Sequence, residues 1–208
     1  MNKKPFLIGI AGGTGSGKST FSGSLQKMYP GDLLIIPYDN YYKSQEGLTD
    51  EEKAKVNYDC PDVLDTKILI NNLKDLIKGN NAEIPLYDFA THLRKKEVLD
   101  VAPKPIIMVD GIMTFHDENL REMFDLKIFV DSPEEERLKR RIERDQKERG
   151  RDKEGIIKQF METVKPMHEK YVEPTKAYAD IVSMGGFDDK ALRKVATIIK
   201  SKNIGKEE

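Results

Sequence analysis

The chain has 208 residues with one cysteine, and its 35 lysines and arginines nearly balance its 36 aspartates and glutamates. That balance gives no global electrostatic case for nucleic acid or a membrane surface as partner, and no apolar stretch approaches the roughly 18 residues of a transmembrane helix. Cys60 alone excludes an intramolecular disulfide and a cysteine-rich zinc site, and suits the reducing cytoplasm. The length predicts a single α/β domain, 1–208, with a flexible polar tail at 200–208.

A glycine-rich motif follows the first apolar run. Pro5–Ala11 is long enough for one buried strand, and Gly12–Ser19 fits G-x-x-x-x-G-K-[ST] without a mismatch. A helix is expected next, ending near Tyr29. Its apolar stripe is formed by Phe21, Leu25 and Met28. Backbone N–H groups can point together at phosphate oxygens only in conformations that a Cβ would obstruct. Strand, glycine loop and helix therefore predict a nucleotide site.

Two side chains of this loop carry specific roles. Lys18 can reach the β- and γ-phosphates, and the Ser19 hydroxyl can ligate Mg²⁺. A glycine-rich turn without a ligand is the alternative, and the flanking strand and helix make it much less favourable. The predicted ATP-binding residues of this segment are Gly12, Gly13, Thr14, Gly15, Ser16, Gly17, Lys18, Ser19 and Thr20.

Asp39 follows the second apolar run, Leu33–Ile36, which is typical of a parallel strand covered on both faces. In open α/β sheets the ligand crevice lies at the carboxyl edge, where the glycine loop also lies. Asp39 is therefore a candidate general base for an attacking hydroxyl. An ordinary turn residue in Pro37–Asn40 is an alternative of equal weight.

The segment from Lys43 to Asp65 is polar and is expected to form a flap. Thr49-x-x-Glu52 is a capping box for one short helix within it. Asn57–Asp62 then offers polar side chains to a hydroxylated ligand, or forms a proline-containing turn. A further helix, ending at Gly79, is indicated by Leu69, Leu73, Leu76 and Ile77.

A hairpin-like excursion is predicted at about 82–102, from the extended segments Ile84–Phe89 and Glu97–Val101 joined through 90–96. Its aromatic residues, with His92, could frame a planar ring by stacking and hydrogen bonding. The alternative, given equal weight, is that Tyr87 and Phe89 only pack the hairpin down.

Two more buried strands are predicted, at Ile106–Gly111 and Leu126–Asp131. Asp110 stands at the exit of the first, as in a Walker B motif, which favours a direct or indirect Mg²⁺ role over a simple loop cap. Short apolar strands separated by helices predict a doubly wound parallel sheet.

An arginine-rich helix follows, with Ser132 expected at the N-cap, Pro133 at N1 and an end at Arg149. From 137 to 151 there are eight basic and three acidic residues. One alternative is a solvated face with i,i+4 pairs to Glu143 and Glu148. Because arginine, which grips phosphate with a planar fork, outnumbers lysine, a lid at about 133–165 that closes over phosphates is preferred.

The remaining elements are a helix over Gln159–Tyr171, a strand over Ala179–Met184 and a terminal helix over Asp188–Ile199. His116 and His168 fit no ligand spacing, and no role is predicted for them. A D-x-x-G match at 152–155 falls on a predicted helix and no N-K-x-D motif exists, so a GTPase is not favoured.

The assembled motifs resemble the uridine–cytidine kinase family, closest to its bacterial form, from about 6 to 188. Besides the glycine loop they are Asp39-Asn40-Tyr41-Tyr42, Asn57-Tyr58-Asp59 with Pro61-Asp62, Tyr87-Asp88-Phe89 through His92 and Arg94, Arg140-Arg141 through Arg144-Asp145 to Glu148-Arg149-Gly150-Arg151, and Val164-Lys165-Pro166-Met167-His168 to Pro174-Thr175-Lys176. The resemblance implies phosphorylation of the 5′-hydroxyl of uridine or cytidine by ATP and Mg²⁺, in pyrimidine salvage. It also implies a homo-oligomer, commonly a tetramer that responds to CTP.

The resemblance carries roles onto matching residues. Implied catalytic residues are Asp39 as the base, Lys18, and Arg144 and Arg149 on the phosphates. Implied substrate-binding residues are Asp59 on the ribose, Tyr87, Phe89 and His92 around the pyrimidine, and Arg141, Arg151 and Gln159. Asp188 is implied near the ATP base, and Ser19 and Asp110 at the metal.

Three positions depart from the family pattern: Asp110 where Glu is usual, Cys60 where His is usual, and the Gly185–Asp188 loop. The rival functions are a related P-loop kinase acting on ribulose phosphate or pantothenate, and a nucleotide-gated switch ATPase.

Overall fold

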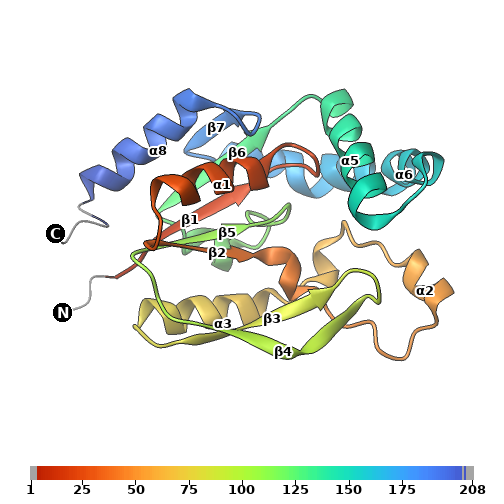
Figure 1. The fold of residues 1–208 in the computed structure, drawn as a ribbon, viewed down its shortest axis with the longest axis horizontal. Coiled ribbons are helices and arrows are strands. Elements are labelled where there is room, and N and C mark those ends of the chain that lie inside the picture. Colours follow the sequence, from red (N-terminus) through yellow and green to blue (C-terminus); the bar gives the residue numbers. More distant parts are fainter. Residues whose placement is uncertain (1–3, 203, 205–208) are drawn as a thin grey trace.

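The computed structural model describes residues 4–202 and 204, and its centre is a five-stranded parallel sheet in the order β2-β5-β1-β6-β7 (Figure 1). The strands are β1 Phe6–Ala11, β2 Leu33–Pro37, β5 Ile106–Asp110, β6 Leu126–Asp131 and β7 Ile181–Met184. The chain winds to one side of β1 and then to the other, so a ligand crevice opens at the carboxyl end of β1. The predicted doubly wound parallel sheet is confirmed.

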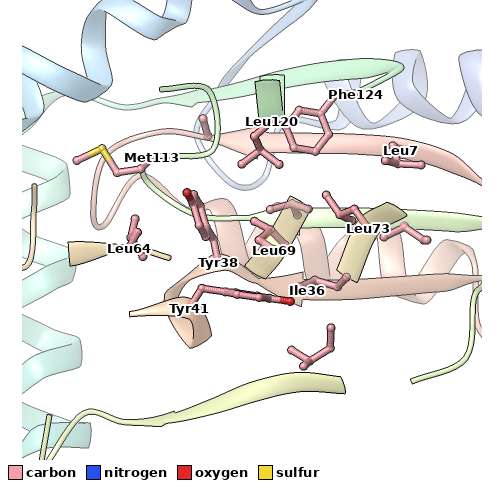
Figure 2. Packing of buried hydrophobic residues seen from close by; sticks show 14 of the residues in the cluster. Leu7, Ile36, Tyr38, Tyr41, Leu64, Leu69, Leu73, Met113, Leu120 and Phe124 are labelled. Atoms are coloured by element: carbon pink, nitrogen blue, oxygen red, sulfur yellow. The ribbon is translucent and has the colours of Figure 1, made fainter. Parts of the chain in front are cut away.

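Helices cover both faces of this sheet, which explains why its strands are continuous apolar runs. On one face lie α1 Lys18–Met28 and α8 Asp189–Ser201, packed against alternate residues of β1 such as Ile8 and Ile10. On the other lie α3 Thr66–Ile77 and α4 Glu118–Glu122, packed against Leu7 and Ile36 (Figure 2). The predicted leucine stripe of α3 is fully buried in this second cluster.

An antiparallel hairpin, β3 Ala82–Asp88 and β4 Leu93–Val101, stands apart from the main sheet (Figure 1). The prediction that its second strand begins at Glu97 is wrong, because Leu93 and Arg94 already pair with Asp88 and Tyr87. Long-range contacts fix this early start: the Arg94 side chain donates to the carbonyls of Tyr41 and Tyr42, at 3.0 and 2.8 Å.

The lid segment begins with α5 Glu134–Arg149. The predicted N-cap is wrong by one residue: the Arg137 N–H donates to the carbonyl of Pro133 at 3.0 Å, so Pro133 is the cap. The Ser132 hydroxyl accepts instead from Arg140 Nη1 at 3.2 Å. After Gly150, α6 Lys153–Gln159 leads into a continuous helical run.

The helix predicted over Gln159–Tyr171 is present, but much of this run is wider than an α-helix. It comprises a π segment Phe160–Val164, α7 Lys165–Met167, a second π segment His168–Val172 and a 3₁₀ segment Glu173–Tyr178. π segments are rare and frequent at functional sites.

Short elements complete the chain. Helix α2 Asp50–Lys55 carries both halves of the predicted Thr49–Glu52 capping box. With α5 and α6 it lies beyond the carboxyl ends of the strands (Figure 1). Helix α8 continues to Ser201, and the rest of the expected tail, 203 and 205–208, lies outside the described residues. Within the described chain, no helix combines the length and apolarity needed to span a bilayer.

Candidate active site

The glycine loop after β1 is shaped by close backbone packing. Gly12, Gly15 and Gly17 have φ of 143°, 74° and 102°, a region that other residues rarely adopt. A Cβ on Gly12 would lie 2.3 Å from the Val130 carbonyl oxygen, and one on Gly15 would lie 2.3 Å from that of Arg137. No side chain caps α1 at Gly17, so the first N–H groups of this helix are available to an anion.

Lys18 lies inside this loop. Its Nζ donates to the carbonyls of Gly12 and Gly13, at 2.8 and 3.1 Å. Burial lowers the lysine pKa, while nearby Asp110 and Asp39 act to raise it. Within the described residues, the buried Ser16 hydroxyl has no hydrogen-bond partner. Orphaned donors and a buried cation suit a loop that receives phosphate oxygens.

Asp39 and Asp110 leave adjacent strands at the same edge, since Pro37 of β2 pairs with Asp110 of β5. Asp39 lies in the 3₁₀ turn directly after β2. Burial raises the Asp39 pKa to about 6, Lys18 acts against this, and Asp110 adds to it. A carboxylate with this pKa is suited to accept a proton near neutral pH.

Asp110 also faces α1, where its Oδ2 accepts from the Ser22 hydroxyl at 2.9 Å. Burial raises its pKa, and Lys18 acts to lower it. No group of three or more His, Cys, Asp or Glu able to hold a metal ion occurs in the part of the chain that the structure describes. A cation at Ser19 and Asp110 would therefore need phosphate oxygens and water as further ligands, which is the usual habit of Mg²⁺.

An aromatic cluster lies where the hairpin meets the flap. The rings of Tyr58 and His92 stack with centroids 4.5 Å apart, and Tyr42 lies 5.3 Å from Tyr87. Phe89 packs edge-on against Tyr87, at 5.2 Å. His92 has φ of 58°, which is unusual for a residue with a side chain and is found at functional sites. The cluster offers flat faces to a planar ring.

Asp59 lies between the aromatic cluster, where an acceptor would bind, and the glycine loop. Burial raises its pKa, and the arginines 141 and 144 act to lower it. Asp59 and the glycine loop line the same small hollow. Its lining residues are Gly13, Thr14, Asp59, Ile112, Val164, His168 and Val172. The hollow connects the two halves of the predicted site.

The arginines predicted on α5 meet neighbouring groups of the lid. Arg141 Nη2 and Arg151 Nη1 both donate to Gln159 Oε1, at 2.9 and 2.8 Å, and Arg141 Nη1 donates to the Thr14 hydroxyl at 3.3 Å. Arg149 lies 5.4 Å from the centroid of the Phe89 ring. The lid therefore contacts both the glycine loop and the hairpin.

The buried carboxylate of Asp145 lies within ion-pair distance of four arginines of the lid. Asp145, which is 0% exposed, lies 2.8 Å from Arg144 and 3.5 to 3.8 Å from the nitrogens of Arg141, Arg149 and Arg151. The alternative of a solvated face is also present on this helix, where Arg140 pairs with Glu136 one turn away at 3.5 Å, while the arginines around Asp145 face the other way.

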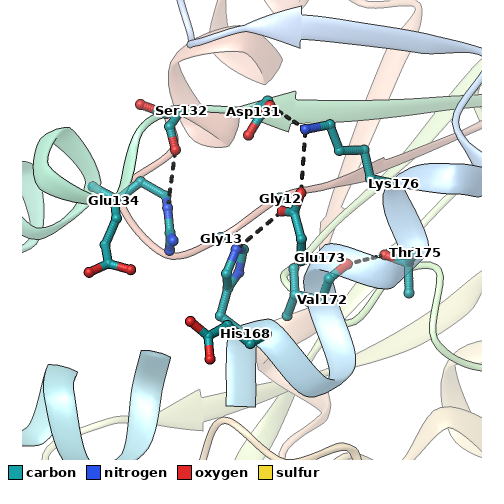
Figure 3. Close-up of polar contacts among 12 residues, drawn as sticks. Gly12, Gly13, Asp131, Ser132, Glu134, His168, Val172, Glu173, Thr175 and Lys176 are labelled. Atoms are coloured by element: carbon teal, nitrogen blue, oxygen red, sulfur yellow. Dashed lines mark hydrogen bonds and ion pairs between the residues drawn. The ribbon is translucent and has the colours of Figure 1, made fainter. Parts of the chain in front are cut away.

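A second polar network was not foreseen from the sequence (Figure 3). His168 Nε2 lies 3.3 Å from Glu173, and Lys176 bridges Glu173 and Asp131. A Cβ on Gly13 would lie 3.0 Å from His168 Cε1, so the imidazole packs directly against the glycine loop. Burial, with help from a nearby arginine, lowers the pKa of His168 to about 4, so its ring is neutral.

Arg137 packs against the same part of the loop. Its Nη1 would lie 2.5 Å from a Cβ on Gly13, and in the described part of the chain this nitrogen has no hydrogen-bond partner. The motif that runs from Val164–His168 to Pro174–Lys176 points to this region, but the members of the network come from separate elements, so the sequence does not show that they meet.

Asp188 lies at the start of α8. Its carboxylate accepts from the N–H groups of Ala191 and Met184, at 3.0 and 2.9 Å, so it caps the helix. The preceding Gly186 packs on the glycine loop, where a Cβ would lie 2.6 Å from the Gly17 carbonyl oxygen. The segment thus borders the nucleotide site while Asp188 itself is engaged in capping.

Comparison with known proteins places this chain in a family of kinases. The model of the Phosphoribulokinase / Uridine kinase family matches residues 7–188. A uridine kinase of Clostridium novyi is 49% identical over 90% of both chains, and one of Lactobacillus johnsonii is 42% identical over 97% of both. The fold is similar to that of phosphoribulokinase from Rhodobacter spheroides, with a TM-score of 0.64 at 14% identity over 88% of this chain and 71% of that one.

Proposed function

Because the chain belongs to the phosphoribulokinase/uridine kinase family, we propose that it transfers the γ-phosphoryl group of ATP to the 5′-hydroxyl of uridine or cytidine. The products are UMP or CMP, as in pyrimidine salvage. The observation that carries this proposal is the position of Asp39, on the strand edge beside Lys18 and the glycine loop. A carboxylate there can accept the proton of an alcohol acceptor. A simple nucleotide switch has no such acceptor and needs no base for it.

The reaction forms a bond from the 5′-oxygen to the γ-phosphorus and breaks the bond from that phosphorus to the β–γ bridging oxygen. The bonding electrons leave with ADP, and the hydroxyl proton goes to Asp39. Lys18, Arg144 and Arg149 offset the charge on the phosphate oxygens, and positioning supplies most of the remaining acceleration. The raised pKa of Asp39 supports this assignment of the base.

Mg²⁺ fits the polar edge of the site, and it supplies charge neutralisation on the phosphates when bound. Ser19 would hold it through its hydroxyl, and Asp110 through its carboxylate. The bond from Ser22 orients that carboxylate. Because Asp is one methylene shorter than Glu, a water between Asp110 and the ion is the arrangement we propose.

The acceptor is held by the residues that the family resemblance assigns. Asp59 binds the ribose hydroxyls, and the aromatic cluster takes the pyrimidine between Tyr87, Phe89 and His92. The nucleoside-side polar residues are Arg141, Arg151 and Gln159. Asp188 would approach the ATP base from its cap position.

Three further properties rest on the resemblance and on composition. We propose a homotetramer, which native mass measurement tests, with no nucleic acid or membrane as partner. The single Cys60 supports work in the cytoplasm. A related acceptor such as ribulose 5-phosphate or pantothenate is the second candidate, and neither needs the aromatic cluster.

The test is an acceptor panel of uridine, cytidine, adenosine, ribulose 5-phosphate and pantothenate, each with ATP and Mg²⁺. We expect ADP release only with uridine or cytidine, and a product heavier by one phosphoryl group in the mass spectrum. ADP release without any acceptor would instead support a switch ATPase, and release with ribulose 5-phosphate or pantothenate would support the second candidate.

A further inference from the structure

Asp145 has an environment that its neighbours on α5 do not share. Its side chain is 0% exposed, whereas the guanidinium-bearing side chains around it are 8% exposed at Arg141, 36% at Arg144, 40% at Arg149 and 32% at Arg151. Four arginines surround this carboxylate, with Asp59 near Arg141 and Asp39 near Arg144 and Arg149, so the arginines still outnumber the carboxylates that face them. A buried charge is tolerated only where opposite charges or hydrogen bonds compensate it, so the carboxylate and the arginines depend on one another.

These arginines form two pairs with different surroundings. Arg141 and Arg151 share Gln159 as a second partner, and Arg141 also influences Asp59 on the acceptor side. Arg144 and Arg149 both act to lower the pKa of Asp39 at the strand edge, and Arg144 also acts on Asp59.

Asp145 lies within ion-pair distance of both pairs. The half-exposed pair, Arg144 and Arg149, can also meet an anion arriving from outside. The backbone of the same residue fixes the turn after α5, because the N–H groups of Gly150 and Arg151 donate to its carbonyl.

We propose that Asp145 is a positioning residue that couples the two substrate sites. Its carboxylate holds the acceptor-side pair and the phosphate-side pair in one relative position, so that a substrate ordering one pair also orders the other. Coupling of this kind makes each ligand strengthen the binding of the other by the same factor. The proposal rests on the proposed function, because it takes the nucleoside and ATP as the two ligands.

A purely structural role for Asp145 makes a different prediction. If the carboxylate only stabilised the corner between α5 and α6, its loss would lower the unfolding temperature and leave the binding of the two substrates independent or equally coupled. The readout that separates these roles is therefore the coupling factor and not stability.

The test compares Asp145→Asn with Glu143→Gln, which removes the same charge from an exposed position of the same helix. Calorimetry measures the Kd of uridine with and without a non-hydrolysable ATP analogue plus Mg²⁺, and the Kd of the analogue with and without uridine. For the wild type and for Glu143→Gln we expect mutual strengthening within the common range of about 5- to 150-fold. For Asp145→Asn we expect that factor to fall to nearly one, with kcat reduced at least about tenfold.

Asp145→Glu keeps the charge and lengthens the side chain by one methylene, and it provides the measurement if the amide variant does not fold. We expect it to bind each ligand alone as the wild type does and to lose at least half of the coupling factor. Wild-type coupling in a folded Asp145→Asn or Asp145→Glu variant would overturn the proposal, as would its absence from the wild type. None of these results bears on the acceptor panel, which decides the reaction itself.

Discussion

Asp39→Asn tests the electrostatics of the site and the chemistry together. Burial raises the pKa of this carboxyl from 3.8 to about 6. At about 1.36 kcal/mol per pKa unit, the ionised side chain lowers the free energy of unfolding at neutral pH by at most about 3 kcal/mol. Since Asp39 is partly open to the cleft, about 2 kcal/mol is the expected gain on substitution.

The sign of the effect follows from proton linkage. The folded protein holds the Asp39 proton more tightly than the unfolded chain does, because its folded pKa is raised. The stability contributed by this group is full below pH 3.8, is lost as the pH rises through about 6, and stays lost above that. The amide of Asp39→Asn has no charge to bury. The gain in the free energy of unfolding over the wild type is therefore full at pH 8 and falls to roughly half at pH 5.

The assay pairs turnover with thermal unfolding. We expect kcat of Asp39→Asn to fall by about 10² or more, the usual scale for a lost general base, with ATP binding preserved. The unfolding temperature at pH 8 should rise by about 4 to 8 °C, since 1 kcal/mol corresponds to about 2–4 °C in a chain of this size. Asp32→Asn, at the other end of β2, is the control and should leave both values near those of the wild type.

Two results would refute this reasoning separately. Near-normal turnover in Asp39→Asn would remove the residue from the role of base. An unfolding temperature that did not rise, or rose equally at pH 5 and pH 8, would show that burial of this carboxylate does not carry the cost deduced here.

Three further outcomes follow from the same structure. In the wild type, kcat/KM should rise with pH up to about 6, the pKa of Asp39, and a flat profile from pH 5 to 8 would contradict this. Gly12→Ala should abolish ATP binding in calorimetry, because its Cβ would lie 2.3 Å from the Val130 carbonyl oxygen at a φ of 143°; Gly23→Ala, with nothing within 4 Å, should bind normally. Leu73→Ala should lower the free energy of unfolding in urea by about 2–5 kcal/mol, since this side chain is 0% exposed, and a smaller loss would mean that the core collapses around it.

The sequence sufficed for features encoded within a few consecutive residues. The strand, glycine loop and helix around Lys18 need only local backbone geometry, and the capping box of Thr49 and Glu52 needs only one turn of helix. The doubly wound parallel sheet also followed, because short buried strands alternate with helices along the chain. These predictions hold wherever short-range rules decide the structure.

The sequence predictions fail where residues far apart in the chain determine the local structure. The start of β4 depends on Arg94 reaching the carbonyls of Tyr41 and Tyr42, which no pattern within the hairpin announces. No metal-ligand spacing in the sequence predicts a role for His168, whereas in the structure it contacts Glu173 and the glycine loop. His168 lies in a π segment and Glu173 in a 3₁₀ segment, and no α-helical pattern describes the phase of either.

Helix α5 shows why the phase of the charges matters more than their number. Arg137, Arg141 and Asp145 recur every four residues and are all buried, while the apolar Leu138 and Ile142 are only partly buried. A helix in a core would bury its apolar stripe, and this one buries its charged stripe. Such a face is stable only with opposite charge at hand, and the carboxylates of Asp145, Asp59 and Asp39 are fewer than the four arginines 141, 144, 149 and 151. The excess positive charge is therefore best explained by an anionic ligand that completes the lid.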